Sequence, residues 1–287
     1  MSPDSSDFTI RRVAIIGVGL LGGSVAKSLR RADPHIHVVG VSRSPQTRRS
    51  ALDGGVIDEA CESVAGIGGS CDVVVVATPV DRLASLVIAS AAVTSDACLI
   101  TDVGSTKQSI VDAVKTDPVA ASKFVGAHPI AGSEKTGVAH ATEDLFDEKV
   151  VIITPTDLTT DHRHRQAAQF WRMTGARCLT MTPGQHDCEL AAVSHTPHLI
   201  SALVAQLASP DSLPLVGSGW RDITRVAAGD PEMWTAICLE NHAAILRQLT
   251  RCTEDLLQVG RMIQAGDGDG LRDWFDKSKT IRDQADS

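Results

Sequence analysis

The stretch GVGLLGG, residues 17–23, decides the fold of this 287-residue chain. It follows the apolar run RRVAIIG and opens a segment with helical spacing, so its glycines form Gly-x-Gly-x-x-Gly between a strand and a helix. Gly17 permits the tight turn, Gly19 lets the backbone approach a pyrophosphate, and Gly22 allows close helix-strand packing. The N–H groups at the helix start, including those of Leu20 and Leu21, would hold the phosphates. The stretch predicts a dinucleotide site, and a glycine-rich turn without ligand is the alternative.

Short β-branched runs alternate with helix-like segments along residues 1–182. Near-continuous apolar runs of this length suit strands buried on both faces of a sheet. Their alternation with helices implies right-handed strand-helix-strand units. The pattern therefore predicts an α/β, doubly wound, mostly parallel sheet, a Rossmann-type dinucleotide-binding domain over residues 1–182. The runs are RRVAIIG, HIHVVGV, CDVVVVATP, ACLITDVG, KFVGAHP and KVVIITPT.

The pattern changes around Pro183. Segments such as CELAAVSHTPHLISALVAQLA, residues 188–208, carry apolar residues at helical spacing with no strand-like run between them. We therefore predict an all-α domain over residues 183–287. Because its apolar stripes exceed what about 100 residues can bury alone, we expect a homodimer formed through this domain.

Composition and charge exclude several classes of protein. With 43% hydrophobic and 22% charged residues the chain is globular. Its formal net charge of −8 argues against a nucleic-acid partner, since no Lys/Arg run exceeds a pair. The seven cysteines include no Cys-x-x-Cys pair, so neither a metal site nor a disulfide framework is expected. The polar, acidic N-terminus and the lack of an apolar run near ~18 residues predict a cytoplasmic protein without a membrane partner.

The end of the second predicted strand bears on the choice of cofactor. A site that prefers NAD places Asp or Glu there, about 20 residues after the last glycine, to bind the ribose hydroxyls. This chain instead has Ser42 and Arg43 after Val41. Arg43 could pair with a 2′-phosphate, to which Ser42 and Thr47 could donate hydrogen bonds. The loop favours NADP; NAD is the alternative if Arg43 is a solvated surface residue.

Two further loops leave the carboxyl ends of predicted strands, the edge at which such sheets bind ligands. In ATPVD, residues 77–81, backbone groups of Ala77, Thr78 and Pro79 could contact the cofactor, although an ordinary proline turn is the alternative. In DVGSTK, residues 102–107, Val103 is a further predicted cofactor contact. Ser105 stands at a helix start, where an N-cap is the plainer interpretation.

GAHPIAGSEKTG, residues 126–137, places His128 at the end of another predicted strand. Pro129 biases His128 toward an extended backbone, which limits the directions in which its ring can point. A neutral imidazole held near a nicotinamide can accept the proton of a hydroxyl whose carbon loses hydride. A structural histidine is the alternative.

Five motifs together resemble one enzyme family. In chain order they are GVGLLGGS, DVGSTK, HPIAGSEKTG, SHTPH and GWRDITRVAAGDPEMW, and over essentially its whole length the chain is similar to the prephenate/arogenate dehydrogenases of tyrosine biosynthesis. The resemblance implies an oxidoreductase that removes hydride from C4 of a cyclohexadienol ring to NAD(P)+ while CO2 leaves C1 and the ring becomes aromatic. The product would be 4-hydroxyphenylpyruvate from prephenate or tyrosine from arogenate. The choice between these substrates stays open.

The resemblance also implies roles for single residues. His128 would accept the hydrogen bond or proton of the C4 hydroxyl, with Ser105 assisting at the same oxygen. Arg225 would bind a substrate carboxylate, which suits an anionic substrate in a protein of net charge −8. Asp222 would orient the Arg225 guanidinium; an exposed helical ion pair is the alternative. His195 would lie in the substrate pocket of the helical domain.

Two charges and two other functions stay open. Glu134 and Lys135 follow His128 in a turn and would line or gate the pocket, but they suit solvated loop positions equally well. A β-hydroxyacid dehydrogenase would resemble sequences with a catalytic lysine early in the helical region, and residues 189–208 contain none. A non-enzymatic NAD(P)-sensing module would need no polar residues at the strand ends.

Overall fold

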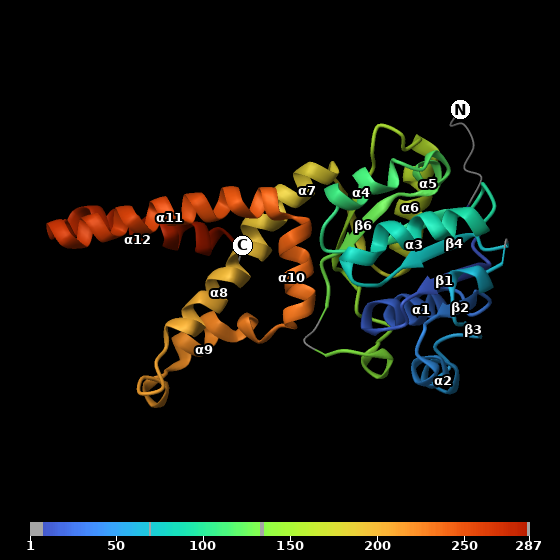
Figure 1. Cartoon of the computed structure of the whole chain (residues 1–287), viewed down its shortest axis with the longest axis horizontal. Helices are drawn as coiled ribbons and strands as arrows, with labels where there is room; N and C mark the ends of the chain where they lie inside the picture. Colours follow the sequence, from blue (N-terminus) through green and yellow to red (C-terminus); the bar gives the residue numbers. More distant parts are fainter. Residues whose placement is uncertain (1–7, 69, 133–134, 286–287) are drawn as a thin grey trace.

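The first five strands form one parallel sheet. The computed structural model describes residues 8–68, 70–132 and 135–285. Its larger sheet has the strand order β3-β2-β1-β4-β5, with all neighbours parallel (Figure 1). The order reverses between β1 and β4, so a ligand crevice is expected at the carboxyl ends of these two strands. The strands are β1 (Arg12–Ile16), β2 (His37–Val41), β3 (Glu59–Cys61), β4 (Val73–Val76) and β5 (Leu99–Asp102).

Helices cover both faces of this sheet, which confirms the predicted doubly wound fold. In β4, Val73 and Val75 belong to one buried apolar cluster, and Val74 and Val76 to the other. Because side chains alternate along a strand, a run of four valines fits only a strand that is buried on both sides. The first cluster includes residues of α1 (Leu20–Ala32), α2 (Pro45–Asp53) and α6 (Asp161–Met173); the second includes residues of α3 (Val80–Val93), α4 (Gln108–Val114) and α5 (Pro118–Lys123).

The last three strands form a separate small sheet. β6 (Gly126–Pro129) pairs antiparallel with β7 (Val150–Thr154), and β7 pairs parallel with β8 (Arg177–Thr180). A parallel bridge between Ile100 and Phe124 joins this sheet to β5. The described part of the chain between β6 and β7 contains only a short 3-10 turn, Val138–His140, and no long crossover helix, so the chain returns antiparallel. The expected series of parallel units is therefore interrupted between β6 and β7, and β7, α6 and β8 form one further parallel unit.

The chain after β8 is helical, as predicted. α7 begins at Pro183 behind a capping box in which Thr182 and Gln185 satisfy each other's backbone N–H groups. α11 and α12 form a long hairpin that extends away from the sheets (Figure 1). None of the described helices has the length and apolarity needed to span a membrane. The remaining helices are α7 (Pro183–Leu190), α8 (Thr196–Leu207), α9 (Ser218–Thr224), α10 (Pro231–Glu240), α11 (His242–Ala265) and α12 (Gly268–Ala285).

Many large apolar side chains of the helical domain lie exposed. Within the described residues, its one buried apolar cluster consists of Ala191, Ala244 and Ile245. A face this apolar needs a covering partner, because it would otherwise stay in contact with water. Side chains that are about 60% exposed on α11 and α12 include Leu246, Leu256, Leu257, Ile263, Phe275 and Ile281.

Candidate active site

The glycine-rich turn has the geometry of a dinucleotide site. Gly17 has φ +97°, and a Cβ added there would lie 2.3 Å from the carbonyl oxygen of Ala77. A Cβ on Gly22 would lie 2.2 Å from the carbonyl oxygen of Gly17. A Cβ on Gly19, by contrast, would meet no atom within 4 Å. The fold itself requires Gly17 and Gly22, whereas Gly19 leaves space beside the start of α1 that a pyrophosphate fits.

A loop after β4 lies against this turn. The side-chain methyl of Thr78 lies 3.1 Å from the position of a Cβ on Gly17. Its Oγ1 hydroxyl is buried and has no hydrogen-bond partner within the described residues. Ala77 and Thr78 are half-buried, Pro79 is exposed, and Val103 is buried behind β5. An orphaned hydroxyl beside the glycine-rich turn fits a bound dinucleotide that completes its hydrogen bonding.

The loop after β2 is braced by an arginine that sequence reasoning missed. Arg48 Nη1 donates to the carbonyl oxygens of Ser42 at 2.5 Å and Arg43 at 3.1 Å. Ser44 caps α2 by accepting from Thr47 N–H. Arg43 itself is exposed. The bracing fixes the backbone that presents the Ser42 hydroxyl and the Arg43 side chain.

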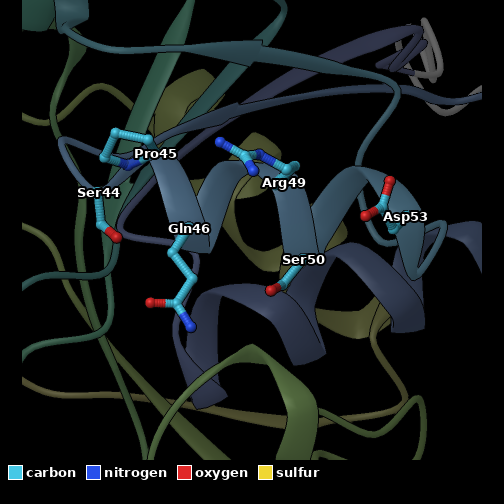
Figure 2. Close-up of a pocket in the computed structure, with 6 residues that line it drawn as sticks. All are labelled: Ser44, Pro45, Gln46, Arg49, Ser50 and Asp53. Atoms are coloured by element: carbon cyan, nitrogen blue, oxygen red, sulfur yellow. The ribbon is translucent and has the colours of Figure 1, made fainter.

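A surface depression runs along α2 directly after this loop (Figure 2). Figure 2 shows the side chains of Gln46 and Ser50 on one side of α2 and Arg49 on another. The depression lies beside the predicted cofactor loop and lacks the histidines of the predicted active site. It is lined by Ser44, Pro45, Gln46, Arg49, Ser50 and Asp53.

Ser105 is not the N-cap of α4, so the alternative to its predicted role at the substrate hydroxyl does not hold. α4 begins at Gln108, and the Ser105 hydroxyl, which is half-buried, has no hydrogen-bond partner among the described residues. The start of α4 is instead capped by a distant carboxylate. Asp187 Oδ1 accepts from Lys107 N–H at 2.8 Å, and Oδ2 accepts from Gln108 N–H at 2.9 Å. Ser105 is thus left available for a ligand.

His128 lies on β6 and is buried. Its Nδ1 lies 2.8 Å from Nε2 of His186, whose Nδ1 lies 2.8 Å from Oδ1 of Asp187. Burial, with smaller contributions from the charges of His186, Lys107 and His195, holds the pKa of His128 well below its usual range. The ring is therefore neutral at pH 7 and can accept a proton.

His195 is held by a second buried contact. Asn241 Nδ2 donates to the carbonyl oxygen of Asp187 at 2.8 Å and lies 3.1 Å from His195 Nδ1. Because the carbonyl requires the amide NH2 group at this position, Nδ1 of His195 accepts and its Nε2 carries the proton. Burial lowers the pKa of His195 to about 4. His195 thus presents a neutral N–H donor.

A π-helical turn sets the positions of both histidines of SHTPH. Residues Ala191–His195 are π-helical, and Pro197 follows with no N–H group to continue the α-helical bonding. His198 stacks on Trp234 with ring centroids 3.4 Å apart, while His195 meets the edge of the same ring system at 6.2 Å. His198 therefore packs, and His195 is the ring with a partner in the polar cluster.

The structure does not bring every predicted substrate residue to His128. Arg225 and Asp222 are both exposed on or after α9, which lies well away from β6 (Figure 1). The described chain contains no ion pair between them, because α9 ends at Thr224 and Arg225 begins a 3-10 turn; the predicted pair is thus not formed. Lys135 is exposed, and Glu134 lies outside the described residues.

The polar residues around His128 were missed because no motif contains them. His186 and Asp187 belong to GQHDC in the first helix after β8, and Asn241 lies between α10 and α11. An adjacent His-Asp pair at this point was the available signal. The described residues contain no group of three or more His, Cys, Asp or Glu side chains that could hold a metal ion.

Comparison with known proteins decides the family. A model described as the nucleotide-binding domain of prephenate dehydrogenase matches residues 25–180, and one described as its dimerization domain matches residues 182–277. This chain belongs to the prephenate dehydrogenase family. Prephenate dehydrogenase of Bacillus subtilis is 34% identical over 94% of this chain and 75% of its own. Cyclohexadienyl dehydrogenase of Zymomonas mobilis is 30% identical over 95% of both chains.

A solved structure of the same family is similar throughout. The prephenate dehydrogenase of Aquifex aeolicus in complex with hydroxyphenyl propionate and NAD+ has a TM-score of 0.89 to this chain and 31% sequence identity. The match covers 96% of this chain and 99% of that one. The predicted resemblance is thereby confirmed, as is the order of a nucleotide-binding domain before a helical one.

Proposed function

We propose that this chain oxidises and decarboxylates prephenate or arogenate, with NADP+ as its preferred hydride acceptor. Family membership supports the reaction. The observation that carries the site assignment is His128, a buried and neutral imidazole on β6, whose neighbour Ala127 is hydrogen-bonded to Asp102 at the carboxyl end of β5. When NAD(P)+ is bound, it supplies the acceptor for the hydride that leaves C4.

The chain's own residues handle the substrate hydroxyl. His128 takes the proton of the C4 hydroxyl as hydride leaves C4, and it returns that proton when loss of CO2 makes the ring a phenolate. Ser105, whose hydroxyl has no partner within the described chain, donates to the same oxygen. His195 donates from Nε2 to a polar group of the substrate. These three side chains need no net uptake of protons to complete the reaction.

Mutation of His128 tests this assignment. His128→Asn should lower kcat by about 10²–10⁴-fold and leave cofactor affinity near that of wild type, since a general base contributes that much. His164→Asn is the matched control, because His164 lies on α6 and, within the described residues, its ring bonds to Thr180 alone. Steady-state assays should use prephenate and arogenate separately, which also decides the substrate. Activity of His128→Asn within about threefold of wild type would refute the role.

The loop after β2 supports NADP+ over NAD+. No carboxylate lies at the end of β2, and Ser42 Oγ, which accepts from Ser44 N–H at 3.3 Å, keeps its own proton for a phosphate. Arg43→Ala should raise KM for NADP+ by roughly 10- to 150-fold and leave KM for NAD+ unchanged, because a charge-assisted contact contributes about 1.5–3 kcal/mol. Arg165→Ala, an exposed arginine on α6, is the control. A wild-type preference for NAD+ would refute the proposal.

A homodimer through the helical domain would cover its exposed apolar side chains. The match to a dimerization domain and the exposed apolar side chains of α11 and α12 support it. Sedimentation should give twice the 30.3 kDa chain mass, and Leu256→Asp combined with Leu257→Asp should give monomers. A wild-type monomer at micromolar concentration would contradict this proposal.

A further inference from the structure

We propose that Asp187 and His186 are positioning residues that fix the proton of His128 on Nδ1 and leave Nε2 as the proton acceptor. The inference rests on the proposed role of His128 and names the residues that set its chemistry. The three side chains form one chain of hydrogen bonds, with both N···O and N···N distances at 2.8 Å.

Asp187 sets the direction of these hydrogen bonds. Its carboxylate is held by two backbone N–H donors at the start of α4, from Lys107 and Gln108. A carboxylate held this way only accepts hydrogen bonds. The ring nitrogen that faces it, Nδ1 of His186, must therefore carry a proton.

The tautomer of His186 in turn fixes the proton of His128. Burial lowers the pKa of His186, against the opposing effect of Asp187, so this ring is neutral and its Nε2 carries a lone pair. His128 Nδ1 lies 2.8 Å from this nitrogen and must donate to it. In a neutral His128 the other nitrogen, Nε2, is then without a proton. The described residues give Nε2 no hydrogen-bond partner, so it is available to a substrate.

The arrangement also prepares for the charged state. When Nε2 of His128 takes the hydroxyl proton, an O–H bond breaks, an N–H bond forms and the ring becomes an imidazolium. Its Nδ1–H already points to His186, and an anion stands one hydrogen bond further on. His186, Lys107 and His195 all lower the pKa of His128, so Asp187 can favour the imidazolium only through the hydrogen bond that His186 relays. The same Nε2 returns the proton to the phenolate oxygen.

A purely structural role for the pair makes different predictions. If Asp187 only caps α4 and His186 only fills space, replacing His186 with an apolar residue would change stability but leave the proton on His128 where it was. If the hydrogen bonds from Asp187 through His186 set the tautomer, removing the His186 ring lets the His128 proton move to Nε2. The Nε2 atom would then donate instead of accepting. An acceptor restored at position 186 should then restore activity.

The test compares His186→Leu with His186→Gln. Leu offers no acceptor, whereas the Gln amide oxygen can accept from His128 Nδ1–H. His186→Leu should lower kcat about 100-fold or more with KM changed less than about threefold, within the range of a lost general base. His186→Gln should regain at least about tenfold of that loss. His164→Leu, outside the site on α6, should retain wild-type kcat.

Nuclear magnetic resonance reads the tautomer directly. In protein labelled with 15N-histidine, two-bond correlations show which ring nitrogen carries the proton, and His128→Asn assigns the signals. Wild type should show His128 protonated on Nδ1, and His186→Leu should shift the proton toward Nε2. If His186→Leu does not fold, a wild-type His128 protonated on Nε2 still overturns the inference.

Two results separate this inference from the proposed function. If His128→Asn is inactive but His186→Leu keeps kcat within about threefold of wild type, the positioning role is wrong and the proposed function stands. If His128→Asn is fully active, the proposed role of His128 itself is wrong.

Discussion

Replacing Lys107 with Met should destabilise the protein more than any change to an exposed ion pair. The Lys107 ammonium is fully buried and bonds to Asp102 Oδ2, which also accepts from Gly104 N–H at 2.9 Å. Asp102 Oδ1 accepts from Ala127 N–H at 2.9 Å. The carboxylate thus joins β5, the loop that carries Ser105, and β6 beside His128.

The magnitude follows from the burial. Met keeps the length of the side chain but leaves Asp102 as a buried anion with two N–H donors and no cation. Loss of one partner from a buried ion pair typically costs about 3–5 kcal/mol. The double variant Lys107→Met with Asp102→Asn should recover part of this cost, since much of it comes from the unpaired charge. Lys279 and Asp283, at 74% and 63% exposure, form the control pair, and Lys279→Met should cost less than about 0.5 kcal/mol.

Urea unfolding followed by circular dichroism at pH 7.5 measures these differences in the free energy of unfolding. The activity of Lys107→Met should also fall, because the loop bearing Ser105 loses its anchor. A Lys107→Met variant within about 1 kcal/mol of wild type would refute the reasoning. So would a double variant less stable than the single one.

Three further results are expected. The pKa of His195 is lowered to about 4, so between about pH 6.5 and 4 the unfolded chain binds more protons and the free energy of unfolding falls as pH drops. In urea titrations, His195→Gln should reduce the slope of the free energy of unfolding against pH by up to about 1.4 kcal/mol per pH unit. A slope equal to that of wild type contradicts this. Gly17→Ala places a Cβ 2.3 Å from the Ala77 carbonyl oxygen and should lose about 1–3 kcal/mol of stability. Gly19→Ala should keep the wild-type urea midpoint and bind NADP+ more weakly. Equal urea midpoints for the two variants would contradict the close contact at Gly17. Arg225 lies away from His128 within one chain, so Arg225→Ala should raise substrate KM by roughly 10-fold or more if the homodimer brings it to a bound substrate, and unchanged kcat and KM would make Arg225 a surface residue.

The amino-acid sequence by itself determined the nucleotide-binding half of the fold. GVGLLGG could be interpreted because a positive φ and close backbone contacts restrict the residues at Gly17 and Gly22, whatever the rest of the chain does. VVVV in β4 could be interpreted because only a strand with two covered faces buries four consecutive valines. Both signals are local, since turn conformation and side-chain alternation depend on neighbours in the sequence. The placement of His128 at a strand end followed from the same local pattern.

Only the tertiary structure decided the surroundings of His128. Asp187 caps α4 from 80 residues away, where a Ser105 cap was the alternative to its predicted catalytic role, and His186 reaches His128 from 58 residues away. Asn241 joins the same cluster from a helix junction that carries no motif. Hydrogen bonds over such separations depend on how α7 docks against the sheet edge, and docking is set by packing that no spacing rule encodes. Because the direction of each bond is fixed by the carboxylate of Asp187, the proton positions on the histidines also depend on this docking.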